Sequence, residues 1–82
     1  MVHGILYVTD IPYGRIFAVD LVTNSWNLVV EYDGEPNGLA WHAQRQTLLI
    51  ADFKQGLLEL DLHTKSIKSL MARFNGESFK RD

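Results

Sequence analysis

A few oxygen and imidazole donors stand where predicted strands begin or end, and these are the residues that could do chemistry. Asn37 lies between a proline and a glycine, Asp10 and Asp52 each close an apolar run, and His42 follows a short apolar segment. Amide and carboxylate oxygens are ligands for hard divalent cations such as calcium. An imidazole can accept or donate a proton near neutral pH.

These donors also have structural explanations. A Pro-Asn-Gly sequence favours a turn by itself. Asp10 and Asp52 occupy equivalent places in a repeat, which favours a carboxylate that accepts hydrogen bonds from turn amides. Asp33, Glu35 and Glu77 form an acidic group that could approach a cation, but solvated loop charges are the commoner explanation. The residues alone assign no catalytic group.

The composition excludes several classes of site. The 82 residues include no cysteine, which excludes disulfides, thiolate zinc sites and cysteine nucleophiles. The three histidines share no metal-ligand spacing, and no serine lies in a nucleophile-elbow motif. Eight basic residues are scattered among ten acidic ones, for a net charge of −2, so we expect no nucleic acid and no anionic membrane as a partner.

The apolar runs are too short to span a bilayer. Residues 1–4 have neither the basic region nor the apolar run of a secretory signal. We therefore expect no transmembrane segment, no signal peptide and a cytoplasmic location.

An internal repeat indicates the elements that position these donors. The sequence aligns with itself at a shift of 41 to 42 residues, which is the length range of a β-propeller blade built from short strands. The matching segments are residues 6–10 (LYVTD) with 48–52 (LLIAD), 16–21 with 57–62, and 33–35 with 75–77. We expect an antiparallel all-β fold that is a fragment of a propeller.

Short apolar runs separated by turn residues predict seven strands. We place them near residues 4–9, 15–20, 26–32, 37–42, 47–52, 56–61 and 66–72. Asp20 and Asp61 stand at the entrances of two equivalent hairpin turns, where we expect each aspartate to accept hydrogen bonds from backbone amides two residues on. Residues 1–36 would form an incomplete three-stranded blade, and residues 37–82 a full blade followed by a C-terminal loop from residue 73, together making one structural unit. Because its outer sheet faces would be apolar, we expect other copies or a longer parent chain to complete it.

Three segments resemble the SMP-30/gluconolactonase/LRE-like family. They are residues 10–17 (DIPYGRIF), 32–41 (YDGEPNGLAW) and 50–53 (IADF). The resemblance implies about two blades of a six-bladed propeller, whose full length would be roughly 300 residues. It also implies a metal-dependent lactone hydrolase with a divalent cation, commonly calcium, at one end of the channel.

In such a site the cation polarises the lactone carbonyl and activates a water, while a carboxylate takes the proton. The resemblance implies Glu, Asn and Asp ligands from the inner strands of different blades. Asn37 matches one such position, either as a metal ligand or as a substrate contact, and His42, Asp52 and Asp10 are weaker candidates. The Glu and Asp ligands have no counterpart here, so we expect the isolated chain to be inactive.

Two hypotheses about function follow. The first is a fragment of a lactone hydrolase that takes a small lactone or sugar acid and needs further blades. The second is a non-catalytic structural or binding module that self-assembles through blade faces and edges. Both predict a homo-oligomer, and three copies would supply six blades.

Overall fold

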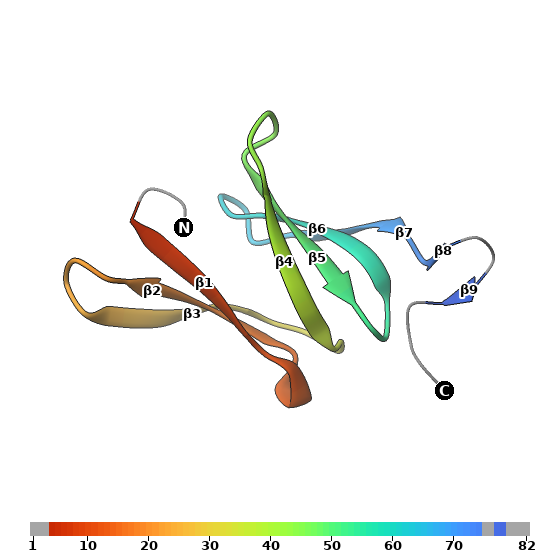
Figure 1. The fold of residues 1–82 in the computed structure, drawn as a ribbon, viewed down its shortest axis with the longest axis horizontal. Coiled ribbons are helices and arrows are strands. Elements are labelled where there is room, and N and C mark those ends of the chain that lie inside the picture. Colours follow the sequence, from red (N-terminus) through yellow and green to blue (C-terminus); the bar gives the residue numbers. More distant parts are fainter. Residues whose placement is uncertain (1–3, 75–76, 79–82) are drawn as a thin grey trace.

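The computed structural model describes residues 4–74, 77 and 78, and this part of the chain is built from antiparallel β-strands (Figure 1). The one helical element within it is the short 3-10 turn η1 (Ile11–Tyr13). The strands are β1 (Ile5–Asp10), β2 (Arg15–Asp20), β3 (Ser25–Glu31), β4 (Pro36–His42), β5 (Thr47–Asp52), β6 (Gly56–Asp61), β7 (Ile67–Met71), β8 (Arg73–Phe74) and β9 (Glu77–Ser78). The prediction of an all-β fold is confirmed, and the seven predicted strands correspond to β1 to β7.

The strands form separate sheets in chain order. The first sheet has the order β1-β2-β3, and the second has the order β4-β5-β6-β7. All neighbouring strands are antiparallel, as expected for strands joined by short turns. The first three strands and the next four thus form two separate hydrogen-bonded sheets.

The prediction of loop from residue 73 onward is wrong for four residues. β8 and β9 pair with each other, with Arg73 opposite Ser78 and Phe74 opposite Glu77. The sequence between these strands is Asn-Gly, the dipeptide that most strongly favours a tight hairpin. The other residues of this predicted loop lie outside the described part of the chain.

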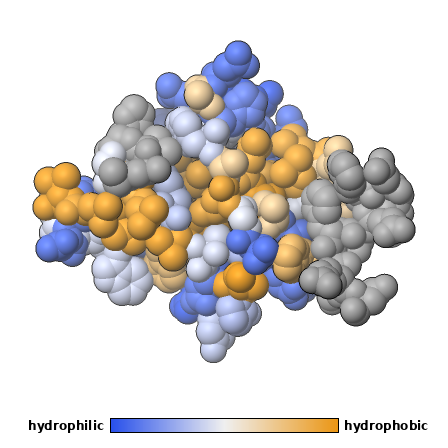
Figure 2. Space-filling model, in the orientation of Figure 1, coloured by the Kyte–Doolittle hydropathy of each residue, from blue (hydrophilic) through white to orange (hydrophobic). Residues whose placement is uncertain are grey.

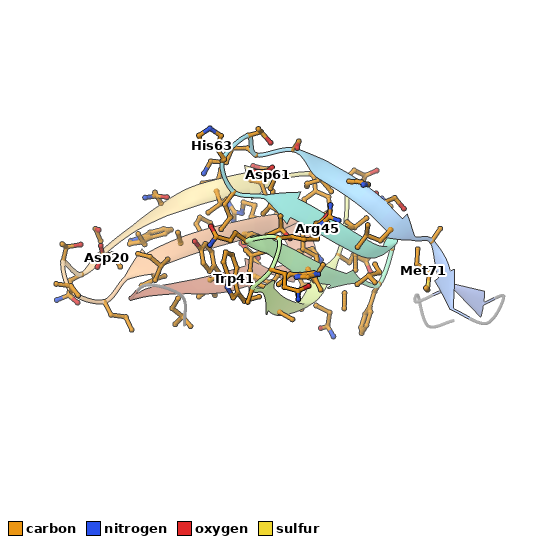
Figure 3. All side chains as sticks on the ribbon, turned by 90° about the horizontal axis from the view of Figure 1, so that it is seen from above. Asp20, Trp41, Arg45, Asp61, His63 and Met71 are labelled. Atoms are coloured by element: carbon orange, nitrogen blue, oxygen red, sulfur yellow. The ribbon has the colours of Figure 1, made fainter. Side chains whose placement is uncertain are left out.

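The core lies between the two sheets. Ile16 from the first sheet and four residues of the second sheet are almost completely buried and form one cluster, the other four being Leu48, Ile50, Leu58 and Leu60. The sheets lie one over the other, and β1 contacts β4 (Figure 3). Since one fully buried aliphatic side chain contributes about 1.5 to 3 kcal/mol, this contact holds the two repeats together.

The repeat is visible in the two hairpin turns. Oδ1 of Asp20 accepts hydrogen bonds of 2.9 and 3.3 Å from the backbone N–H groups two and three residues later. Oδ1 of Asp61 accepts the same two bonds at 2.8 and 3.2 Å. Asn24 and Lys65 have φ angles of 58° and 65° where each chain reverses. The prediction that these aspartates bind turn amides is confirmed, and both lie at hairpin ends in Figure 3.

Among the described residues, no helix has the length and apolar character needed to cross a bilayer.

Candidate functional site

Asp52, the last residue of β5, is the most heavily hydrogen-bonded of the predicted site residues. Its side chain is completely buried. Oδ2 accepts a 2.6 Å bond from the hydroxyl of Tyr32, and both oxygens accept from the backbone N–H of Glu35 at 3.0 and 3.1 Å. Oδ1 also accepts 2.8 Å bonds from the backbone N–H groups of Lys54 and Gln55. The carboxylate thus organises two loops at the end of β5.

Tyr32 lies in the loop that connects the first sheet to the second. Burial raises the pKa of its phenol well above the usual range, and the hydrogen bond to Asp52 and the charge of that carboxylate raise the pKa further. The phenol therefore stays protonated at physiological pH and acts as a fixed hydrogen-bond donor. It is not suited to proton transfer, because its pKa is far from neutrality.

Gly34 is the residue that lets the loop lie against this pair. A Cβ atom at this position would stand 2.4 Å from Oδ2 of Asp52 and 2.3 Å from a ring carbon of Tyr32. A backbone hydrogen bond also joins this loop to the residue that follows β5: the N–H of Phe53 donates a 3.0 Å bond to the carbonyl of Glu35. The loop formed by residues 32–35 thus packs against the end of β5.

Asp10 occupies the repeat-equivalent place at the end of β1 but has different partners. It forms an ion pair with Arg15, whose Nε donates a 3.1 Å bond to Oδ2 and whose Nη2 contacts the same oxygen. The residue two positions after Asp52 donates its backbone N–H, whereas the residue two positions after Asp10 is Pro12, which has none. The expected bonds from turn amides are therefore found at Asp52, while Asp10 is held by an arginine.

Asn37 is exposed and lies at an irregularity in β4. Pro36 pairs with Asp52 and Gly38 pairs with Ala51, so within these two described strands Asn37 stands as an extra residue without a partner. This is a β-bulge, a feature that redirects a side chain and is frequent beside functional sites. β4 is also an edge strand of its sheet.

His42, the last residue of β4, lies far from Asn37. Five residues of extended strand separate the two, which corresponds to about 16 Å. β1 and β5 end near the point where β4 begins, whereas β4 ends at the opposite side of the molecule (Figure 1). The structure therefore brings Asn37 and Asp52 to one end and leaves His42 at the other.

The acidic loop residues have separate roles. Asp33 forms an ion pair with Lys54 and accepts a hydrogen bond from Gln55 through its backbone carbonyl. The hydrogen bond to Asp33 is the main cause that raises the pKa of Lys54. Glu35 contributes its backbone N–H to Asp52. The side chain of Glu77 lies outside the described part of the structure.

Glu59 is a buried carboxylate in the middle of β6 and was not among the residues predicted from the sequence. Its Oε2 accepts a 2.8 Å bond from the hydroxyl of Thr47 and lies 2.7 Å from Nε of Arg45. The hydrogen bond from Thr47, followed by the charge of Arg45, lowers the pKa of Glu59. A signal was present, since Glu59 interrupts a run of leucines that otherwise predicts a buried strand.

An open polar pocket of about 220 Å³ surrounds this carboxylate. Its lining residues are Arg45, Thr47, Glu59, Asp61, Ser66 and Lys68. It lies at the His42 end of the second sheet, because Thr47 pairs with both His42 and Asp61. The pocket is therefore remote from Asn37.

The described residues do not by themselves fit a calcium site. Calcium takes six to eight oxygen ligands. Both oxygens of Asp52 already accept N–H or O–H hydrogen bonds, and Asp10 is paired with Arg15. Of the predicted site residues at that end, Asn37 alone has no side-chain hydrogen bond or ion pair among the described residues. Within residues 4–74, 77 and 78, no three His, Asp or Glu side chains are placed to share one metal ion.

Comparison with protein-family models gave no matching family, and comparison with curated proteins gave no matching relative.

Proposed function

We propose that this chain forms two successive blades of a gluconolactonase-like β-propeller and contributes one amide, Asn37, to the channel of the completed ring. The completed ring would hydrolyse lactones with a divalent cation whose remaining ligands come from other blades. The observation that carries the proposal is the bulge at Asn37, which presents an exposed amide from the edge strand of the four-stranded sheet. The innermost strand of a propeller blade lines the central channel, and in this sheet that strand would be β4.

The isolated chain would have no hydrolase activity on this account. Hydrolysis needs a carboxylate free to take a proton, and the two candidate carboxylates at the Asn37 end are engaged: Asp52 with loop amides and Asp10 with Arg15. The function of these two blades is then to position Asn37 and to close the ring.

Nuclear magnetic resonance titration tests the role of Asn37 without requiring activity. We expect sodium gluconate at millimolar concentration to shift the side-chain amide signals of Asn37. The side-chain signals of Asn27, which is exposed on β3 of the other sheet, serve as the internal control. Equal shifts at both residues, or no shift at Asn37, would remove the support for a channel amide.

A second candidate function is a non-catalytic module that assembles with other copies. It is favoured by the apolar side chains on the outward face of the first sheet, where Leu6, Val8 and Trp26 are all exposed. Contiguous exposed apolar surface of this kind marks an interaction site.

A further inference from the structure

The outward face of the first sheet is apolar apart from the Asp10–Arg15 ion pair at one end. The strand register places six apolar side chains on this face, which we call the first outer face: Leu6, Val8, Phe17, Val19, Trp26 and Leu28. Trp26 is 67% exposed and packs edge-on against Phe17, with ring centroids 5.1 Å apart. Figure 2 shows hydrophobic atoms on the visible surface over the part of the molecule that holds β1 and the β2–β3 hairpin. An aromatic ridge therefore projects from this face.

The outward face of the second sheet carries a shallow apolar hollow. The register places five small or apolar residues on one part of this face, which we call the second outer face: Gly38, Ala40, Leu49, Ala51 and Leu57. The same side of the sheet continues to Thr47, Glu59 and Asp61, which line the polar pocket. The residues of the second outer face, with Leu39, line a hollow of about 290 Å³. Because Gly38, Ala40 and Ala51 have little or no side chain, the hollow can accept larger side chains from a partner.

The repeat relates these outer faces to the faces that are buried between the sheets. The residues of the first outer face correspond in the repeat to the residues that the second sheet buries in the core. The matching residues, in order, are Leu6, Val8, Phe17 and Val19 with Leu48, Ile50, Leu58 and Leu60. The second outer face matches the buried face of the first sheet. There Leu49 and Leu57 correspond to Tyr7 and Ile16, which pack in the core.

The repeat thus gives two kinds of sheet face, and one face of each kind is buried between the sheets while its repeat equivalent is exposed. The contact between the sheets joins the Ile16 face of the first sheet to the Leu48–Ile50 face of the second. The two outer faces are the repeat equivalents of these two partners. They can meet each other only between different copies, because they lie on opposite sides of the same pair of sheets.

We propose that copies of this chain pack head to tail, with the second outer face of one copy on the first outer face of the next. This inference rests on the second candidate function above and names its partner. The packing repeats the sheet-to-sheet contact already present in the chain, so Leu49 and Leu57 of one copy contact Val8 and Phe17 of the next. Such a contact is heterologous and produces either a closed ring or an open chain.

Shape favours this pairing over one between two identical faces. Two first outer faces would set the Trp26 ridge against another Trp26 ridge, whereas the second outer face offers small residues. Glu59 lies next to Leu49 on the second outer face, as their register shows. Its carboxylate is already paired with Arg45 and Thr47, which lowers the cost of covering it.

Light scattering of variants that block one face each tests the proposal. V8K blocks the first outer face and A51K blocks the second, and both positions are exposed. V22K is the matched control, because Val22 is 87% exposed at a hairpin tip outside both faces. We expect the wild type and V22K to have a mass that is a multiple of the 9.4 kDa chain. V8K alone and A51K alone should be monomers.

An equimolar mixture of V8K and A51K separates head-to-tail packing from every symmetric alternative. Each variant keeps the face that its partner has lost, so the mixture should form one-to-one dimers. A monomeric wild type would overturn the proposal and assign the outer faces to a different protein or to further blades of a longer chain. An oligomeric wild type in which one variant alone still dimerises would also overturn it, in favour of contacts between identical faces, and an oligomeric wild type with a monomeric mixture would exclude any contact between the two outer faces.

Folding is checked separately by circular dichroism and by amide spectra. If V8K or A51K is unfolded, L28K and A40K replace them, because these positions are also exposed and lie on the same two faces. The mass measurement requires neither calcium nor lactone. A negative result in the mass measurement therefore bears on head-to-tail packing alone. The proposal that Asn37 is a channel amide is tested separately by the Asn37 titration.

Discussion

The hydroxyl of Tyr32 donates a 2.6 Å hydrogen bond to Oδ2 of Asp52, and this bond ties the loop that leaves the first sheet to the end of a strand in the second. The same carboxylate accepts three backbone N–H groups from both sides of the junction. Asp52 is thus a structural residue that connects the two repeats. The expected effects of replacing Asp52, Tyr32 or Gly34 depend on this contact.

Replacement of Asp52 by alanine should destabilise the chain strongly. The change leaves several buried donors without an acceptor, each costing about 1 to 3 kcal/mol, so we expect a loss of about 3 kcal/mol or more. Urea unfolding followed by circular dichroism measures it. Asp20→Ala is the control, because Asp20 bonds turn amides at an exposed hairpin and its loss should cost about 1 kcal/mol. Equal losses in the two variants would contradict the assigned role.

Tyr32→Phe should remove part of the alkaline loss of stability. The pKa of Tyr32 is raised in the folded state, so its contribution is fully present below about pH 10 and declines as pH rises above that value. One such group changes the free energy of unfolding by at most about 1.4 kcal/mol per pH unit. Urea unfolding between pH 8 and 11 should show a shallower decline in Tyr32→Phe than in the wild type. Tyr13→Phe, at an exposed tyrosine, should follow the wild type.

Gly34→Ala should be poorly tolerated, although the backbone of Gly34 does not have a positive φ angle. Its Cβ would overlap Oδ2 of Asp52 and the ring of Tyr32, so we expect a loss of about 2 kcal/mol. Gly38→Ala is the matched control, because its Cβ would make an ordinary 3.7 Å contact with Ala51. Thermal melting of the two variants provides the measurement, and a melting temperature for Gly34→Ala as high as that for Gly38→Ala would refute the close packing.

Glu59→Gln should alter the acid limb of the stability curve. The pKa of Glu59 is lowered in the folded state, so its stabilising contribution is present above about pH 4.5 and declines as pH falls below it. We expect the variant to be less stable than the wild type at pH 7 and the gap to narrow below pH 4.5. Glu31→Gln, at an exposed position, is the control. A gap that stays constant from pH 7 to pH 3 would show that the charge of Glu59 is not involved.

Gluconolactone hydrolysis by the isolated chain should equal the spontaneous rate. Asn37→Ala should not change it, because Asp52, Asp10 and Glu59 are engaged in hydrogen bonds or ion pairs, and the described residues place no three His, Asp or Glu side chains to share a metal ion. A pH-stat assay with and without calcium measures acid release. Calcium-dependent hydrolysis that is lost in Asn37→Ala but retained in Asn27→Ala would disprove the inactivity of the single chain.

The regular part of the fold could be predicted from the sequence because it depends on local patterns. Apolar runs and turn residues predict the strands. Asp20 and Asp61 occupy equivalent positions in the repeat, and this equivalence predicts two hairpins with matching hydrogen bonds. The four-residue exception is the pair of short strands β8 and β9. An Asn-Gly dipeptide was the available signal for that hairpin.

The site was less predictable, because its contacts join residues distant in sequence. The bond from Tyr32 to Asp52 spans twenty residues and depends on how the loop crosses between the sheets. Equivalence in the repeat suggested equal roles for Asp10 and Asp52, yet Pro12 removes one amide donor and Arg15 provides an ion pair instead. The bulge at Asn37 depends on pairing with β5, which a single segment does not reveal.

Native mass spectrometry of an equimolar mixture of V8K and A51K tests the central claim most directly, since the two variants differ in mass. The claim is that the chain carries two complementary outer faces, each equivalent by the repeat to one partner of its internal sheet contact. The predicted result is a dimer that contains one copy of each variant, with neither variant dimeric alone. Monomers only, or dimers of one variant with itself, would contradict it.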